Sequence, residues 1–315
     1  HFLTLDYDYM LILSGDQLYQ MDFNEMLEAH IKNKAEISIA TIPVNGKDAT
    51  SFGILKTNEK GAITSFIEKP ATELLPEWIS DTGEDMQKDG RNYLASMGIY
   101  IFNKDLLVKL MENPDTIDFG KEIIPQSIDE YLTLSYQYEG YWTDIGNIES
   151  FFEANLGLTD DFPKFDLYSK KKRIYTHARM LPTTKISGTI LDKTVIADGC
   201  IINAGKIEHS VIGVRSRIDK ESTIINTYMM GSDFYQPIED IFNDGIVSMG
   251  IGCRCFIKNA ILSNQKVNSL CSEEEMDEKI IQLRSGKKLI FVYDPLDGSS
   301  NIESCMSVGT IFGLY

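Results

Sequence analysis

The spacing of hydrophobic and polar positions changes twice along this 315-residue chain. Up to about residue 156, short apolar runs alternate with segments in which apolar residues recur at helical spacing. Residues 9–13 are an apolar run that leads to Asp16, which is typical of a buried parallel strand, and residues 21–33 have helical spacing. Strands and helices that alternate in this way predict an α/β fold.

The rest of this first part continues the alternation. Further strands are expected at 36–43, 53–56, 64–67, 96–102 and 131–139, and further helices at 106–112 and 150–156. The strands at 53–56 and 64–67 should pair around a turn at Gly61. We therefore predict a Rossmann-like domain over 1–160 with a mostly parallel sheet, in which functional loops follow the carboxyl ends of the strands.

After a polar linker at 161–185, aliphatic residues recur at every sixth position. These positions are Ile190, Ile196 and Ile202, and after a break Ile212, Ile218, Ile224 and Met230. A sustained period of six is typical of a left-handed parallel β-helix, in which each coil buries one aliphatic side chain per face. A β-meander with chance spacing is the alternative. The period ends near Leu262, so we assign 186–262 to the β-helix and 263–315 to a short α+β tail.

Composition narrows the classes of partner. The net charge of −17 disfavours nucleic acid and anionic membranes, which need clustered Lys and Arg, and no apolar run approaches the ~20 residues of a membrane helix. Five cysteines without secretory spacing favour the cytoplasm. The basic run at 170–173 is expected to be a solvated loop, with a sugar-phosphate effector site as the alternative. Because the chain opens on His1 rather than Met, we expect a cut N-terminus that would hide any targeting peptide.

Residues suited to phosphate chemistry stand at intervals in the first domain. Asp16 follows an apolar strand and Asp144 lies in Trp-Thr-Asp-Ile-Gly, so the two could hold Mg²⁺, which prefers one or two carboxylates together with phosphate oxygens and water. Lys69 is a suitable cation for a sugar phosphate, and Glu68 can accept hydrogen bonds from sugar hydroxyls. Gly53 and Gly98 allow close approach of the backbone to a sugar ring. Taken singly, each has a plain structural interpretation, such as a helix cap for Asp16.

Read together, these motifs resemble a known family. Residues 8 to about 262 resemble glucose-1-phosphate adenylyltransferase (ADP-glucose pyrophosphorylase), through the segments at 11–19, 95–100, 118–125 and 141–146 and through 209–213, 215–217 and 229–231 in the β-helix. The resemblance implies a GT-A-like nucleotidyltransferase domain, ATP and glucose 1-phosphate as substrates, and a homotetramer with an effector site. It implies the following roles: Asp16 and Asp144 carry Mg²⁺, Glu68 and Lys69 hold glucose 1-phosphate, and Gly53, Ser96 and Gly98 lie near the sugar.

One segment of that family pattern is missing. The family's glycine-rich Gly-Gly-x-Gly-Thr-Arg-Leu loop, which cradles the ATP phosphates, stands nowhere in this sequence. We therefore expect negligible pyrophosphorylase activity from this chain alone.

The tail carries a second motif. A predicted strand at 288–293 leads to Asp294-Pro-Leu-Asp297-Gly-Ser-Ser-Asn301, in which the two aspartates could hold Mg²⁺ around a phosphate; the alternative is an acidic turn with an Asp cap. Residues from about 263 resemble an internal fragment of class I fructose-1,6-bisphosphatase. That resemblance implies metal ligands at Glu273, Glu274, Asp294 and Asp297, with Gly298, Ser299 and Ser300 near the phosphate. Because so short a segment cannot close its own core, we expect no bisphosphatase activity.

Three interpretations follow from the two motifs. The first, which the sequence favours, is a nucleotidyltransferase of ADP-glucose synthesis in the glycogen or starch pathway. The second is a bisphosphatase, and the third is a non-catalytic protein that binds sugar phosphates or assembles through its β-helix.

Overall fold

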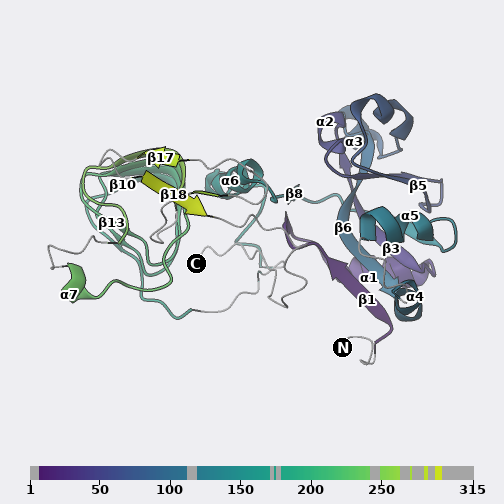
Figure 1. Ribbon diagram of the computed structural model, residues 1–315, viewed down its shortest axis with the longest axis horizontal. Coiled ribbons are helices and arrows are strands. Elements are labelled where there is room, and N and C mark those ends of the chain that lie inside the picture. The colour runs from purple at the N-terminus through teal and green to yellow at the C-terminus, as the bar shows by residue number, and fades with distance from the viewer. Residues whose placement is uncertain are drawn as a thin grey trace. The chain divides into compact units, whose positions relative to one another are not determined.

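The computed structural model describes residues 7–111, 119–170, 174, 179–241 and 249–262, together with the backbone of three short strands beyond them (Figure 1). The chain divides into two compact units, the first formed by His1–Ser14 and Gln20–Trp142 and the second by Gly15–Tyr19 and Thr143–Tyr315. Each unit has its own hydrophobic core.

The first unit is a six-stranded sheet with helices packed on it. Its strands are β1 (Tyr9–Leu13), β3 (Ile37–Val44), β4 (Gly53–Thr57), β5 (Ile63–Glu68), β6 (Tyr93–Asn103) and β7 (Thr133–Gln137). Its helices are α1 (Phe23–Lys32), α2 (Gly46–Ala49), α3 (Glu84–Lys88), α4 (Lys104–Leu110) and α5 (Ile124–Ser127), with a 3₁₀ turn η2 (Thr72–Trp78) and a π turn η3 (Phe119–Ile123). The alternation of strands and helices, and the β4–β5 pair around Gly61, are confirmed.

Strand β6 organises this sheet, and it corrects part of the expected topology. Strands β1, β3 and β4 all run antiparallel to β6, and only the β3–β7 pair is parallel among the described strands of this sheet. Parallel pairs predominate over the described chain as a whole because the second unit supplies them. The run at 9–13 is not a buried parallel strand: β1 pairs on one side only, so its side chains alternate between exposed and half-buried.

The core of the first unit lies between the sheet and helices α4 and α5. Strand β3 is buried along its whole length, and Ile37, Ile39 and Phe102 pack with Leu107 of α4 and Ile124 of α5. These large apolar side chains are the main source of stability for the unit, at roughly 1.5–3 kcal/mol for each one buried.

The second unit is a parallel β-helix preceded by a helix. Its elements are β2 (Gln17–Tyr19), β8 (Trp142–Asp144), α6 (Ile148–Leu156), η4 (Gly157–Thr159), β9 (Lys185–Ile186), β10 (Ile190–Ile196), β11 (Ile201–Ile202), β12 (Lys206–Ile212), β13 (Arg217–Ile218), β14 (Thr223–Met229), α7 (Ile238–Ile241) and β15 (Phe256–Leu262). One sheet stacks β10, β12, β14 and β15, and another stacks β9, β11 and β13, all in parallel. Figure 1 shows the coils lying over one another.

The aliphatic columns of the β-helix follow the pairing register. Ile196, Ile212, Met229 and Leu262 stand in one column, and Ile207, Ile224 and Ile257 stand in another. The six-residue period therefore predicts most of the core but misplaces its first and last members, because Ile190 is 66% exposed and Met230 lies one residue beyond the buried Met229. Met229 is fully buried, whereas Met230 is 39% exposed, because the register brings Met229 beside Ile212.

One corner of the β-helix is built from residues with a left-handed backbone. Lys193, His209, Asn226 and Asn259 take matching positions on successive coils, with φ values between 43° and 54°. His209 Nδ1 lies 2.9 Å from Asn226 Oδ1, and Asn226 Nδ2 donates to Asn259 Oδ1 at 3.2 Å. We refer to these four residues as the corner column.

Beyond Leu262 the described residues are three short strands, β16 (Leu270–Cys271), β17 (Ile280–Gln282) and β18 (Lys288–Val292), which fits the strand expected at 288–293. Several sequence-predicted residues lie outside the described residues, namely Glu273, Glu274, Asp294, Asp297, Gly298, Ser299 and Ser300, as do three of the four basic residues at 170–173. No helix in the described part of the chain is long and apolar enough to cross a membrane.

Candidate functional site

The two predicted metal carboxylates lie together in the second unit. Strand β2, which follows Asp16, pairs with β8, which ends at Asp144. The backbone N–H of Ile145 donates to the Asp16 carbonyl at 2.9 Å, so the two segments are joined directly beside the aspartates. Helix α6 begins just beyond, with the Asn147 side chain accepting from Ser150 N at 2.9 Å as the N-cap.

The side chains of this pair converge on one backbone position. A Cβ placed on Gly146 would lie 3.1 Å from Asp16 Oδ2 and 3.3 Å from Asp144 Oδ1. The amide N–H of Gly146 also donates to Asp144 Oδ1 at 3.0 Å, which fixes the orientation of that carboxylate. Two acidic groups therefore share a small space that a side chain at residue 146 would fill.

This arrangement fits a magnesium ion. Mg²⁺ is bound through one or two carboxylates and keeps further positions for water and phosphate oxygens, so a pair of carboxylates is a sufficient protein contribution. Within the described residues no group of three or more His, Cys, Asp and Glu side chains gathers, so no larger all-protein metal cage competes with this site.

The residues predicted to hold the sugar form a row across three strands of the first unit. Gly53 on β4 pairs with Glu68 on β5. Because Ile54 pairs with Ala95, Gly53 stands one step further along, beside Ser96 on β6. A Cβ on Gly53 would lie 2.5 Å from Phe66 Cζ and 2.8 Å from Glu68 Oε2, so a larger residue there would displace both the ring and the carboxylate.

Irregular backbone marks both ends of this row. Lys69 has φ of 44°, which non-glycine residues seldom adopt, and its backbone N–H donates to the Phe52 carbonyl at 3.1 Å. The side chain of Lys69 is exposed. On β6, the register with β3 shifts beside Ser96, and Gly98 has φ of 66° and donates its N–H to Ser96 Oγ at 3.3 Å. Such bulges re-aim side chains and often lie next to active sites.

Two parts of the chain match known protein families. Residues 1–161 match the nucleotidyl transferase family. The chain belongs to the nucleotidyl transferase family. Residues 179–279 match the GLGC left-handed parallel beta-helix domain, and the two domains in this order fit the ADP-glucose pyrophosphorylase family. The predicted fold class, an α/β nucleotidyltransferase domain followed by a left-handed β-helix, is therefore confirmed.

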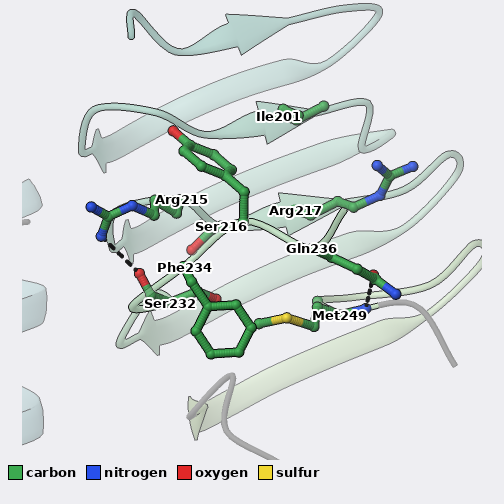
Figure 2. Close-up of a pocket in the computed structure, with 10 residues that line it drawn as sticks. Ile201, Arg215, Ser216, Arg217, Ser232, Phe234, Gln236 and Met249 are labelled. Atoms are coloured by element: carbon green, nitrogen blue, oxygen red, sulfur yellow. Dashed lines mark hydrogen bonds between the residues drawn. The ribbon is translucent and has the colours of Figure 1, made fainter. Parts of the chain in front are cut away.

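A separate hollow of about 50 Å³ lies in the β-helix of this nucleotidyl transferase. Figure 2 shows Arg215 and Arg217 on opposite sides of it. Arg215 Nη1 donates to the Ser232 carbonyl at 3.2 Å, and Arg217 Nη2 lies 3.3 Å from Asp219 Oδ1. The two guanidinium groups are thus held apart rather than directed at a common anion.

Sequence reasoning missed one residue of the carboxylate site. In the sequence Gly146 only ends the Trp-Thr-Asp-Ile-Gly motif, and its position two residues after Asp144 is the one available signal. The convergence of Asp16 and Asp144 on Gly146 depends on the pairing of β2 with β8, which sequence spacing does not reveal.

Proposed function

We propose that this nucleotidyl transferase is a glucose-1-phosphate adenylyltransferase, which forms ADP-glucose and pyrophosphate from ATP and α-glucose 1-phosphate. The observation that carries the proposal is the convergence of the Asp16 and Asp144 carboxylates on Gly146. The match of residues 179–279 to the GLGC left-handed parallel beta-helix domain supports ADP-glucose synthesis over other nucleotidyl transfer reactions.

The chemistry joins two polyanions. An oxygen of the sugar phosphate attacks the α-phosphorus of ATP, the new O–P bond forms, and the bond to the β-phosphate oxygen breaks as pyrophosphate leaves. A magnesium ion held by Asp16 and Asp144 would neutralise phosphate charge during this displacement. The Gly146 amide keeps Asp144 turned toward that position, so the carboxylate needs little reorganisation.

The sugar phosphate would be held by the first unit. The exposed ammonium of Lys69 supplies positive charge for the phosphate, and the half-buried carboxylate of Glu68 accepts hydrogen bonds from sugar hydroxyls. Gly53 and Gly98, together with Ser96, leave room for the ring beside the sheet. The same family resemblance implies a homotetramer.

Binding of glucose 1-phosphate tests this proposal directly. Because the sequence lacks the glycine-rich loop, we choose calorimetric titration with glucose 1-phosphate and Mg²⁺ rather than turnover as the readout. Replacing Lys69 by alanine should weaken binding about tenfold or more, since a hydrogen bond to a charged group contributes about 1.5–3 kcal/mol. Lys60, an exposed lysine in the turn that joins β4 to β5, provides the matched control variant Lys60→Ala.

Two results would count against the proposal. One is a wild-type chain that does not bind glucose 1-phosphate, and the other is equal weakening by Lys69→Ala and Lys60→Ala. Tighter binding of fructose 1,6-bisphosphate, lost in Asp294→Asn, would favour the bisphosphatase interpretation instead.

A further inference from the structure

We propose that Gly146 is a positioning residue of the metal site, because its missing side chain keeps open the space that the two carboxylates share. This inference rests on the proposed function, which places a magnesium ion at Asp16 and Asp144. It assigns a role to a residue that would otherwise be read as part of a turn.

Backbone conformation does not explain a glycine at this position. Gly146 is not among the residues with positive φ, so an L-amino acid could adopt its backbone geometry without strain. What crowds the position is the pair of carboxylates: the three heavy atoms nearest to a Cβ are Asp16 Oδ2 at 3.1 Å, Asp144 Oδ1 at 3.3 Å and Asp16 Cγ at 3.8 Å. Separations of 3.1 and 3.3 Å are tighter than ordinary contacts, so one carboxylate or both would have to move.

Gly146 acts on Asp144 in a second way. Its N–H donates to Asp144 Oδ1, the same oxygen that a Cβ would crowd. A methyl group at residue 146 would push this oxygen away from its position beside the amide that orients it. Groups that orient metal ligands typically change metal affinity by about 10–100-fold when they are altered.

The chain offers a matched control on the same helix. Gly157 follows the carboxyl end of α6, whereas Gly146 lies just before its amino end. Gly157 has φ of −58° and ψ of −19°, and a Cβ there would meet nothing within 4 Å. Gly157→Ala therefore adds the same methyl group without touching a carboxylate.

The test is a titration with Mn²⁺ alone, followed by the loss of its free-ion electron paramagnetic resonance signal. We expect Asp16→Asn to remove the tightest site, Gly146→Ala to weaken it about tenfold or more, and Gly157→Ala to leave it unchanged. If Asp16→Asn has no effect, or if the wild-type chain does not bind Mn²⁺, the metal site of the proposed function is wrong. If Asp16→Asn removes the site but Gly146→Ala binds like the wild type, only the present inference fails.

A metal-free measurement keeps the inference testable if Gly146→Ala folds poorly. The change in thermal midpoint caused by Gly146→Ala is measured in the wild type and in an Asp16→Ala background, in which the nearer of the two crowded carboxylates is absent. Crowding predicts that Gly146→Ala costs less in the Asp16→Ala background than in the wild type. An equal cost in both backgrounds would show that the glycine serves the turn and not the carboxylates, and would overturn the inference.

Discussion

Residues with a left-handed backbone occur in both units of the molecule, but their surroundings differ. In the corner column of the β-helix, neighbouring coils supply partners, and the Asn226 side chain bonds to the residue on each side of it. In the first unit Lys69 has the same kind of backbone, yet its ammonium makes no hydrogen bond or ion pair with another residue in the described part of the chain.

The difference shows how each unit compensates an unfavourable conformation. A left-handed residue other than glycine costs roughly 1–2 kcal/mol. In the β-helix this cost recurs on successive coils, and at His209, Asn226 and Asn259 it is offset by side-chain bonds between coils, as expected where every repeat contacts only its neighbours. At Lys69 no such bond offsets the cost, and uncompensated strain of this kind is typical of ligand-binding positions.

The largest effect is expected from breaking the corner column. Asn226→Ala removes two side-chain hydrogen bonds and places alanine at φ of 45°, so it should lower the free energy of unfolding of the second unit by about 1–3 kcal/mol. Asn226→Gly loses the same bonds but tolerates the backbone, and it should cost less. If calorimetry showed both the alanine and the glycine variant melting at the wild-type temperature, the side-chain bonds of the corner column would not offset the cost of its left-handed backbone.

Periodicity explains why the β-helix could be predicted more fully than the first unit. Ile202, Ile218 and Ile224 could be assigned to the core because each coil repeats the same environment. The antiparallel pairing of β1 with β6 could not be predicted, because an apolar run such as 9–13 fits a parallel or an antiparallel strand equally well. The chemistry of Asp16 and Asp144 followed from residue type, whereas their meeting at Gly146 depends on contacts between segments far apart in the sequence.

A smaller effect of opposite sign is expected at Lys69. Lys69→Gly relieves the backbone strain and should stabilise the first unit by about 0.5–1 kcal/mol, while it weakens binding of glucose 1-phosphate. Lys69→Ala should weaken binding without the gain in stability. Of the two tryptophans, Trp78 lies in η2 of the first unit and Trp142 begins β8 at the boundary with the second. In a Trp142→Phe background, fluorescence of Trp78 therefore reports unfolding of the first unit.

A stability of Lys69→Gly no greater than that of Lys69→Ala would contradict the idea that strain is stored at this residue. Equal binding by wild type and both variants would remove Lys69 from the proposed sugar-phosphate site, whatever happened to stability.

The smallest effect concerns His30, a buried polar group of the first unit whose cost is desolvation rather than strain. Its Nδ1 lies 2.8 Å from Ser38 Oγ and its Nε2 lies 3.0 Å from Asn103 Oδ1. Because Asn103 Nδ2 donates to the Ala35 carbonyl, Asn103 Oδ1 is left to accept from His30 Nε2–H. Burial lowers the pKa of His30 from its ordinary value of 6.5, so the folded unit favours the neutral ring.

The pH dependence follows from that shift. Below a pH of about 6.5 the unfolded chain binds a proton at His30 that the folded unit resists, so stability present at neutral pH is lost as the pH falls toward the lowered pKa of the folded state. Tryptophan fluorescence melts between about pH 7.5 and about pH 5 should show a decline in the thermal midpoint that is smaller in His30→Gln, which keeps polar groups at this position without titrating. Equal declines in the two proteins would show that His30 is not protonated on unfolding in this range, and that its bonds to Ser38 and Asn103 compensate burial in either charge state.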